Sequence, residues 1–245
     1  MRLEAWGVAG LPEVRPGDDL AAMIAERAEL RDGDVLVVAQ KVVSKAEGRL
    51  RDLRSVRPSP RALDYAERHQ SDPRVVQLVL DESVRVVRDE RVLIVETRHG
   101  FVCANAGIDH SNVEADDTVV LLPEDPDASA SRLRTRLHEL TGRHVGVIVS
   151  DTFGRPWRVG IANVALGVAG VAAVIDHRGR LDDFGRELTA TVVAVADEMA
   201  ATAELVMGKT CRVPAVVLRG WTVATEAAPG RGRDLVRPAE LDLFR

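Results

Sequence analysis

The 245-residue sequence predicts a globular chain that mixes strands with helices, and three observations lead to this expectation. Several short runs are rich in β-branched residues and end in polar residues, which is typical of buried strands. Other segments repeat apolar residues three and four positions apart, which is typical of helices that bury one face. Two further runs have the spacing of a β-hairpin. With 46% hydrophobic and 29% charged residues, the composition is that of an ordinary soluble protein.

The first part of the chain predicts a strand, a helix and a second strand. Residues 1–8 form the first strand candidate. Asp18 and Asp19 then open a helix that Gly33 is well placed to end. Residues 35–43 are the next strand candidate, and an unusually polar segment continues from them.

A loop-rich region and a hairpin follow. Residues 52–72 are rich in Arg, Pro and Asp and predict a loop with a short helix near 61–69. Residues 84–87 and 92–95 predict the two strands of a hairpin. A further strand is expected to start at Phe101 and to end in polar residues.

The second half predicts more strands and two longer helices. Residues 119–122 form a strand candidate, and residues 123–131 read as a linker. The linker feeds a helix with Leu133, Leu137 and Leu140 on one face. A strand is expected at 145–149, and a second apolar run follows it in the sequence. An amphipathic helix is expected at the end of the segment 189–208. The last candidates are a strand at 214–218 and a mobile tail at 228–233.

Composition also bounds the function. The net charge of −5 argues against broad nucleic-acid binding. Cys103 and Cys211 form no disulfide framework or zinc pattern, and the N-terminus lacks the apolar core of a signal peptide. The longest nearly apolar run, residues 161–175, is too short to cross a bilayer. We therefore expect a cytoplasmic protein with no membrane partner.

Polar groups follow the strand at 145–149 and suggest a ligand site. Asp151 and Thr152 supply hard oxygen atoms, which suit Mg²⁺ or Mn²⁺. Arg155 and Arg158 supply forked donors for a phosphate or a carboxylate. A capping Asp-Thr pair and two solvated arginines would explain the same residues, and this stretch alone does not decide between the two interpretations.

A second dense stretch ends in Asp109 and Asn112, which could face a metal or a nucleotide. A turn rich in Asn and Asp explains them equally well. His110 is the one histidine worth testing as a ligand. Because Asp109 and Asp151 each end an apolar run in a polar turn, we expect them to share a metal site although 42 positions separate them.

Three further features are weighed in the same way. Lys41 and Lys45 lie four positions apart beside a serine, so an anion site competes with two solvated lysines. Cys103 lies in an apolar run and reads as a core residue rather than a nucleophile. The segment 207–210, Met-Gly-Lys-Thr, mimics the end of a phosphate-binding loop, but position 203 is Ala where the motif needs Gly, and no strand precedes it.

Five blocks together are more specific than any single motif. In chain order they are QKVVSKAEGR (40–49), CANAGIDHSN (103–112), SDTFGRPWRVGIANVALGVAG (150–170), DHRGRLDDFGREL (176–188) and ADEMAATAELVMGK (196–209). They resemble the coenzyme F420-0:L-glutamate ligases, which are the γ-glutamyl ligases of a deazaflavin cofactor. The resemblance covers roughly residues 3–243.

The resemblance implies an architecture and an activity. The fold would be α+β, with mixed, largely antiparallel sheets and flanking helices in an arrangement particular to the family. One ligase domain would span residues 1–245, with a division into two subdomains left open, and two copies would form an intertwined homodimer. Such enzymes join L-glutamate to the carboxylate at the end of the side chain of coenzyme F420-0, using GTP and Mg²⁺ or Mn²⁺, with K⁺ as a further candidate.

The resemblance also implies site residues. Its metal ligands map to Asp109, Asp151 and Thr152. Its nucleotide contacts map to Leu11, Pro12, Glu13, Val14, Gln40, Lys45 and Asn112.

The catalytic set is then Asp109, Asp151, Lys45 and Arg155. The role of Arg155 in holding a carboxylate is our own inference, because two anionic reactants must approach each other. Gln40 and Lys209 depart from the residues common in relatives, at positions where the resemblance implies a nucleotide contact and a metal or guanine contact, respectively.

Rival functions remain at this stage. One is a metal-dependent ligase or phosphohydrolase that acts on another carboxylate, and another is a GTP-binding module without catalysis. Relatives occur alone or fused to a C-terminal flavin-binding domain, and the chain fits either a stand-alone ligase or a piece of a fused one. Because the sequence is only 3% aromatic, its core is built from smaller residues, and we expect a homodimer that buries more than about 2,000 Å².

Overall fold

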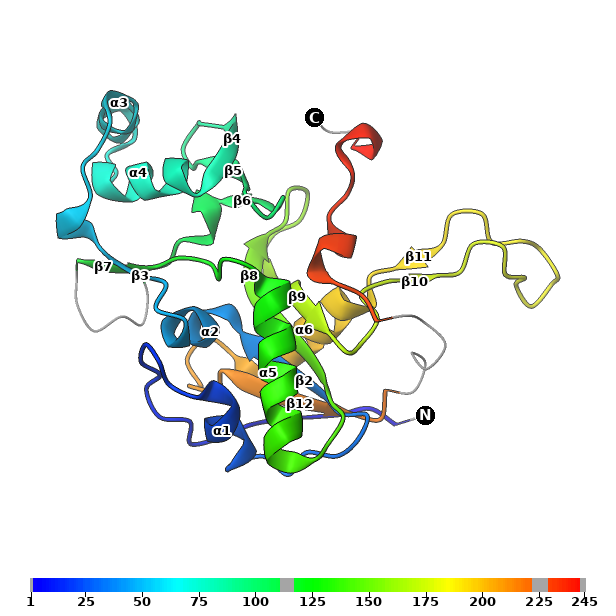
Figure 1. Cartoon of the computed structure of the whole chain (residues 1–245). Coiled ribbons are helices and arrows are strands. Elements are labelled where there is room, and N and C mark those ends of the chain that lie inside the picture. Colours follow the sequence, from blue (N-terminus) through cyan, green and yellow to red (C-terminus); the bar gives the residue numbers. More distant parts are fainter. Residues whose placement is uncertain (1, 111–116, 222–228, 243–245) are drawn as a thin grey trace.

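The computed structural model describes residues 2–110, 117–221 and 229–242. Helices and strands are mixed along the chain, as the sequence predicts (Figure 1). The helices are α1 Leu20–Ala25, α2 Gln40–Ala46, α3 Pro60–His69, α4 Pro73–Asp81, α5 Pro126–Thr141 and α6 Val195–Met207. The strands are β1 Glu4–Gly7, β2 Val35–Ala39, β3 Leu50–Asp52, β4 Ser83–Arg88, β5 Ile94–Thr97, β6 Val102–Ala104, β7 Thr118–Val120, β8 Gly146–Gly154, β9 Ile161–Ala169, β10 Ile175–Asp176, β11 Val192–Val193 and β12 Ala215–Arg219.

A five-stranded sheet is the centre of the fold, with the strand order β1-β12-β2-β8-β9. Strands β2 and β8 are parallel, with Ala39 opposite Ser150, and the other neighbouring pairs in this sheet are antiparallel. The carboxyl ends of β2 and β8 therefore lie side by side, which is where α/β sheets usually present ligand-binding groups.

The central strands are buried on both faces, which explains their nearly continuous apolar sequence. Leu36 and Val38 belong to a core cluster that also contains Leu20 of α1 and Leu133 of α5. Their strand neighbours Val35 and Val37 point the other way, into a second core cluster that contains residues of α6. Helices α1 and α5 thus cover one face of the sheet and α6 covers the other.

A smaller group of elements, α3, α4 and the antiparallel sheet β4-β5-β6, has a core cluster of its own. It lies to one side of the main sheet (Figure 1). The two-stranded ladder of β3 and β7 connects the groups. Buried Arg49 ties them further, because its guanidinium donates to the Leu122 carbonyl (2.8 Å) and pairs with Glu82 (3.0 Å) at the end of α4.

These observations confirm a mixed α+β architecture with largely antiparallel sheets and flanking helices. None of the helices among the described residues has both the length and the apolar character needed to cross a bilayer.

The predicted strand at 35–43 is wrong in its second half. Strand β2 ends at Ala39, and helix α2 begins at the next residue. Gln40 and Lys45 are good helix formers, and the Ser44 hydroxyl donates to Gln40 one turn earlier (2.8 Å). The β-branched residues of α2 imitate a strand in the sequence, but Val43 packs into the core as part of a helix.

Strand β8 is longer than predicted. It does not stop at Val149 but continues to Gly154, with a register shift between Val149 and Ser150. The strand continues because Asp151 and Thr152 pair with residues of β9. These two residues are polar, so the sequence alone does not indicate that they belong to the strand.

Two helix starts were not recognised in the sequence, and they share one signature. Helix α5 begins at Pro126, inside the expected linker, with the Asp125 carboxylate accepting the Ala128 N–H. Helix α4 begins at Pro73 behind Asp72, whose carboxylate accepts the Arg74 N–H. An aspartate cap followed by proline in the first turn is a helix start signal.

Three smaller expectations also differ from the structure. Helix α1 ends at Ala25, well before Gly33. Leu140 of α5 is exposed, whereas Leu133 and Leu137 are buried. In the tail, the Gly230 N–H donates to the Val171 carbonyl (2.9 Å), so this part of the segment predicted to be mobile packs on the body of the chain.

Candidate functional site

Candidate residues meet at the carboxyl ends of β2 and β8. Helix α2 starts directly after β2, and Asp151 and Thr152 follow Ser150 on β8. Asp109 reaches the same place from another segment, because its backbone exchanges two hydrogen bonds with Val120, the last residue of β7 (3.1 and 2.9 Å).

The Asp109 carboxylate is paired with a lysine. Lys41, in the first turn of α2, places its Nζ 2.6 Å from Asp109 Oδ2. Lys45, one turn later, forms an ion pair with Glu13, so the two lysines pair with carboxylates of different segments, and the anion site stays a prediction.

Asp151 is the electrostatic centre of the site. Its pKa is raised from 3.8 to about 6, chiefly by burial and then by the negative charge of Asp109. The ammonium groups of Lys41 and Lys209 act in the opposite direction and lower the pKa. The two carboxylates that the sequence predicts to share a site therefore interact electrostatically across 42 positions of sequence.

Thr152 is held by two partners. Its hydroxyl donates to Asn163 Oδ1 on the neighbouring strand β9 (2.8 Å), and it accepts a hydrogen bond from the Lys209 ammonium group. Lys209 also pairs with Glu204 (2.9 Å). A lysine that follows α6 is thereby brought to the end of β8.

The donor atoms at this site fit a hard divalent cation. Two carboxylates and a hydroxyl are oxygen ligands of the kind that Mg²⁺ and Mn²⁺ take. Burial is the main reason why the pKa of Asp151 is raised, and a bound cation would offset both this cost and the smaller repulsion from Asp109. Within the described part of the chain no group of three or more His, Cys, Asp or Glu side chains could hold a metal, so the site would rely on substrate or water oxygens to complete the shell.

The predicted nucleotide residues come from two segments that the structure joins. Leu11 to Val14 lie in the loop between β1 and α1, and the Lys45–Glu13 ion pair links this loop to α2. Lys45 itself is only 6% exposed and lies in the last turn of α2. The interpretation of Lys45 as a solvated lysine is therefore wrong.

Known proteins match this chain along its whole length. The family described as F420-0:Gamma-glutamyl ligase matches residues 9–220. This chain is 49% identical over 252 residues to the Coenzyme F420:L-glutamate ligase of Methanothermobacter thermautotrophicus, and the match covers 100% of both chains. It is 51% identical over 237 residues to the enzyme of that name from Methanopyrus kandleri, covering 95% of this chain and 94% of the relative.

A third relative, from Archaeoglobus fulgidus and also named Coenzyme F420:L-glutamate ligase, is 49% identical over 246 residues, covering 100% of this chain and 97% of its own. The chain belongs to the F420-0:γ-glutamyl ligase family. The resemblance drawn from the five sequence blocks is thereby confirmed.

Some residues to which the family resemblance or our own inference assigned a role at the site have other contacts in the structure or lie outside its described part. Gln40 is 2% exposed, and its side-chain oxygen accepts the Ser44 hydroxyl, so in this structure it supports α2. Arg155 lies beyond the end of β8, four residues or about 13 Å along the strand from Asp151. Its guanidinium donates to the Val159 carbonyl (2.9 Å), and its carboxylate-binding role stays a prediction. Asn112 lies outside the described residues.

The sequence interpretation missed two contributors to this family's candidate site. Lys209 was noted only as a departure from relatives, and Asn163 was given no role. The cross-strand position of Asn163 opposite Thr152 follows from the hairpin register, which a strand ending at residue 149 would not have provided. Cys103 is buried, and its pKa is raised to about 12 by burial and by the charge of Asp151, which fits the expected core residue.

Proposed function

We propose that this chain joins L-glutamate to the side-chain carboxylate of the deazaflavin coenzyme F420-0, with cleavage of GTP to GDP and phosphate. The single observation that carries the proposal is the full-length match to relatives named Coenzyme F420:L-glutamate ligase. The meeting of Asp109, Asp151 and Lys41 at one sheet edge supports it, because such a reaction requires charge neutralisation at one place.

The reaction divides into two displacements. An oxygen of the acceptor carboxylate attacks the γ-phosphorus of GTP, and GDP leaves with the electron pair of the broken P–O bond. The amine nitrogen of glutamate then attacks the carbonyl carbon of the acyl phosphate, inorganic phosphate leaves, and the amine loses a proton to solvent. Catalysis of phosphoryl transfer rests mainly on positioning and on neutralising charge.

The residues of the site suit these tasks. Asp109, Asp151 and Thr152 would hold Mg²⁺ or Mn²⁺, which neutralises phosphate oxygens when bound. Lys41 and Lys209 keep positive charge beside the two carboxylates and the Thr152 hydroxyl, so an anionic substrate would meet a less negative site. Lys45 and the loop of Glu13 would hold the nucleotide phosphates as one unit.

Release of GDP under four conditions tests the proposal: with both co-substrates, without coenzyme F420-0, without glutamate, and without either. We expect release, and a product heavier by one glutamyl residue, only with both. Release that needs neither co-substrate would indicate a phosphohydrolase instead, and near-zero release with tight GTP binding would indicate a binding module. Omission of K⁺ and exchange of Mg²⁺ for Mn²⁺ in the same assay test the two cation proposals.

We also propose that the chain forms a homodimer. Two hairpins expose large apolar side chains at or near their ends, among them Val159 (98% exposed) and Phe184 (86% exposed). The segment between β10 and β11 extends away from the rest of the chain (Figure 1). Apolar groups gathered on projecting segments favour burial against a second copy.

A further inference from the structure

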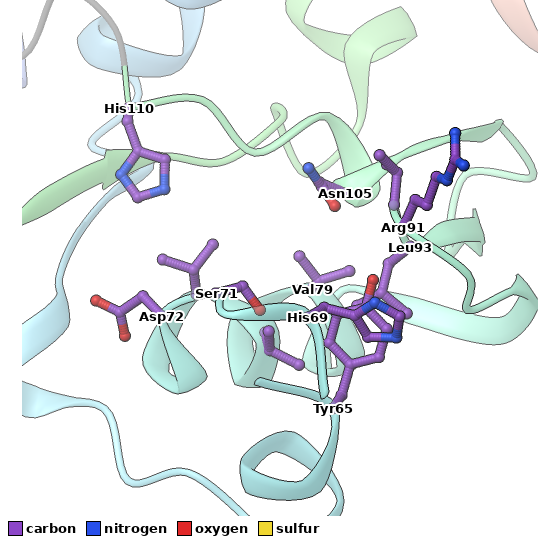
Figure 2. Close-up of a pocket in the computed structure, with 12 residues that line it drawn as sticks. Tyr65, His69, Ser71, Asp72, Val79, Arg91, Leu93, Asn105 and His110 are labelled. Atoms are coloured by element: carbon purple, nitrogen blue, oxygen red, sulfur yellow. The ribbon is translucent and has the colours of Figure 1, made fainter. Parts of the chain in front are cut away.

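The smaller group of elements contains a cavity that lies apart from the Asp109–Asp151 site. Its volume is about 230 Å³. Residues of α3 and α4 form one side, and Asn105 and His110 lie on the other side (Figure 2). The lining residues are Tyr65, His69, Ser71, Asp72, Val75, Val76, Val79, Arg91, Val92, Leu93, Asn105 and His110.

The cavity has an apolar floor and a polar rim. Val76, Val79 and Leu93 are buried and form its deep part, whereas Ser71 and Arg91 are exposed. The rings of Tyr65 and His69 stack with their centroids 4.3 Å apart and their planes tilted by 32°. A buried apolar floor with aromatic rings beside it favours a flat, weakly polar ligand group.

One polar atom in this wall lacks the partner that burial demands. Nε2 of His69 is buried and has no hydrogen-bond partner among the described residues. Leaving a buried nitrogen unpaired costs about 1–3 kcal/mol, so such atoms usually receive a partner from water or a ligand. A neutral imidazole nitrogen can either donate or accept, and a ring system with N–H and C=O groups at its edge could satisfy it in both states.

The cavity is connected to the reaction site through the chain itself. His110 lines the cavity, and the residue before it is Asp109, which pairs with Lys41. Two of the segments that carry predicted nucleotide contacts, the loop of Glu13 and helix α2, contribute no residue to the cavity. The remaining predicted contact, Asn112, lies outside the described residues. This arrangement suits the acceptor rather than GTP.

We propose that this cavity binds the planar deazaflavin ring system of the acceptor, whose side chain then passes His110 and delivers its terminal carboxylate to Asp109 and Asp151. The proposal rests on the proposed function. The volume supports it, because about 230 Å³ is below the 300–1,000 Å³ of pockets that enclose a whole drug-sized ligand, and so suits one ring system rather than the entire coenzyme. Arg91 at the rim can lie over the ring face, as guanidinium groups do on aromatic rings.

Filling the cavity from its rim tests this assignment. Ser71 is exposed, so Ser71→Trp places an indole over the cavity without changing the buried floor. Glu67→Trp is the matched control, because Glu67 is exposed on α3 and does not line the cavity. We expect Ser71→Trp to raise both the Kd for coenzyme F420-0, read from deazaflavin fluorescence, and its KM at least tenfold, with the KM for GTP within twofold and Glu67→Trp equal to wild type.

A second variant probes the unpaired nitrogen. His69→Phe keeps a ring against Tyr65 and removes Nε2, and we expect it to weaken coenzyme F420-0 binding about three- to thirtyfold, with the melting temperature preserved. Unchanged Kd and KM for coenzyme F420-0 in folded Ser71→Trp would overturn the assignment, as would a rise confined to the KM for GTP, which would place the guanine base here. Failure of the wild-type chain to form the glutamylated product would instead overturn the proposed function, while the fluorescence titration would still report whether the cavity binds the ring.

Discussion

Asp151 combines burial with a neighbouring negative charge, and both oppose its ionised form. Its pKa of about 6 lies above the ordinary value of 3.8, so near neutral pH the folded chain holds an unfavourable carboxylate. Ionisable groups with strongly shifted pKa values are common at functional sites. The oxygen atoms of this carboxylate, beside Asp109, suit the binding of a divalent cation.

Replacing Asp151 by Asn should therefore separate activity from stability. The amide keeps the shape and removes the charge, so we expect kcat/KM for glutamylation to fall at least a hundredfold. In metal-free buffer at pH 8 we expect Asp151→Asn to melt no lower than wild type, with a gain in the free energy of unfolding of up to about 3 kcal/mol. Calorimetry with EDTA and assays with Mg²⁺ on one preparation check both parts.

The pH dependence has a definite sign. Because the pKa of Asp151 is higher in the folded chain than its ordinary 3.8, the contribution of this one group to stability falls as the pH rises from about 4 to about 6. The advantage of Asp151→Asn should be absent below pH 4, grow through this window and stay constant above it. A variant that melts lower than wild type at pH 8 without metal would show that the carboxylate is not under this strain.

Helix α2 positions two lysines toward two different segments of the chain. Lys41 pairs with Asp109, and Lys45, one turn later, pairs with Glu13 in the loop before α1. Positions i and i+4 of a helix lie on the same side, so this one short helix connects the proposed metal site with the proposed nucleotide loop.

Lys45→Met should weaken the use of GTP by about thirty- to a thousandfold in kcat/KM, which corresponds to about 2–4 kcal/mol. Because Lys45 is buried, we expect a modest loss of stability, limited to about 1 kcal/mol since the orphaned Glu13 is half-exposed and reaches water. Glu13→Gln removes the same ion pair and keeps the ammonium group, so it should retain more activity. Equal losses in the two variants would mean that the pair only holds the loop.

The sequence predicted the elements whose signals are local and missed those that depend on a partner. The strand at 145–149 was visible from its β-branched residues, but its continuation through Asp151 to Gly154 depends on pairing with β9. The start of α2 at Gln40 was hidden because Val42 and Val43 fit a strand equally well. The approach of Asp109 to Asp151 was inferred from two similar strand ends, whereas Lys209 reaches Thr152 only through the packing of α6.

The contact between α5 and β9 leaves no room for a side chain at Gly167. A Cβ at this position would lie 2.0 Å from the Pro126 carbonyl oxygen, in the first turn of α5. We expect Gly167→Ala to lower the free energy of unfolding by about 1–3 kcal/mol, because backbone must move to accept the methyl group. Gly154→Ala is the matched control, since nothing lies within 4 Å of the added Cβ, and denaturant unfolding of both variants decides.

At the scale of the whole chain, the small group of elements and the main sheet have core clusters of their own. The β3–β7 ladder and the buried Arg49 link the small group of elements to the main sheet. Asp109 lies directly after that small group and beside the ladder, so the proposed ring cavity and the proposed metal site belong to neighbouring halves of one chain. The relative position of the small group of elements and the main sheet then sets the distance between the ring cavity and the metal site, which the side chain of the acceptor must span.

The exposed hairpins give the homodimer a direct test. A monomer that leaves Val159 and Phe184 in water exposes apolar surface on two projecting segments, and burying it against a second copy is worth about 25 cal/mol per Å². We expect wild type to sediment at twice 26.6 kDa at micromolar concentration. The double variant Val159→Asp with Phe184→Ser should sediment as a monomer, because a charge in an apolar interface is costly to desolvate.

The matched control is Leu63→Ser, which replaces an exposed apolar residue of α3 away from the hairpins and should leave the dimer intact. A wild type that sediments as a monomer would contradict the dimer itself, and a double variant that stays dimeric would place the interface elsewhere on the chain.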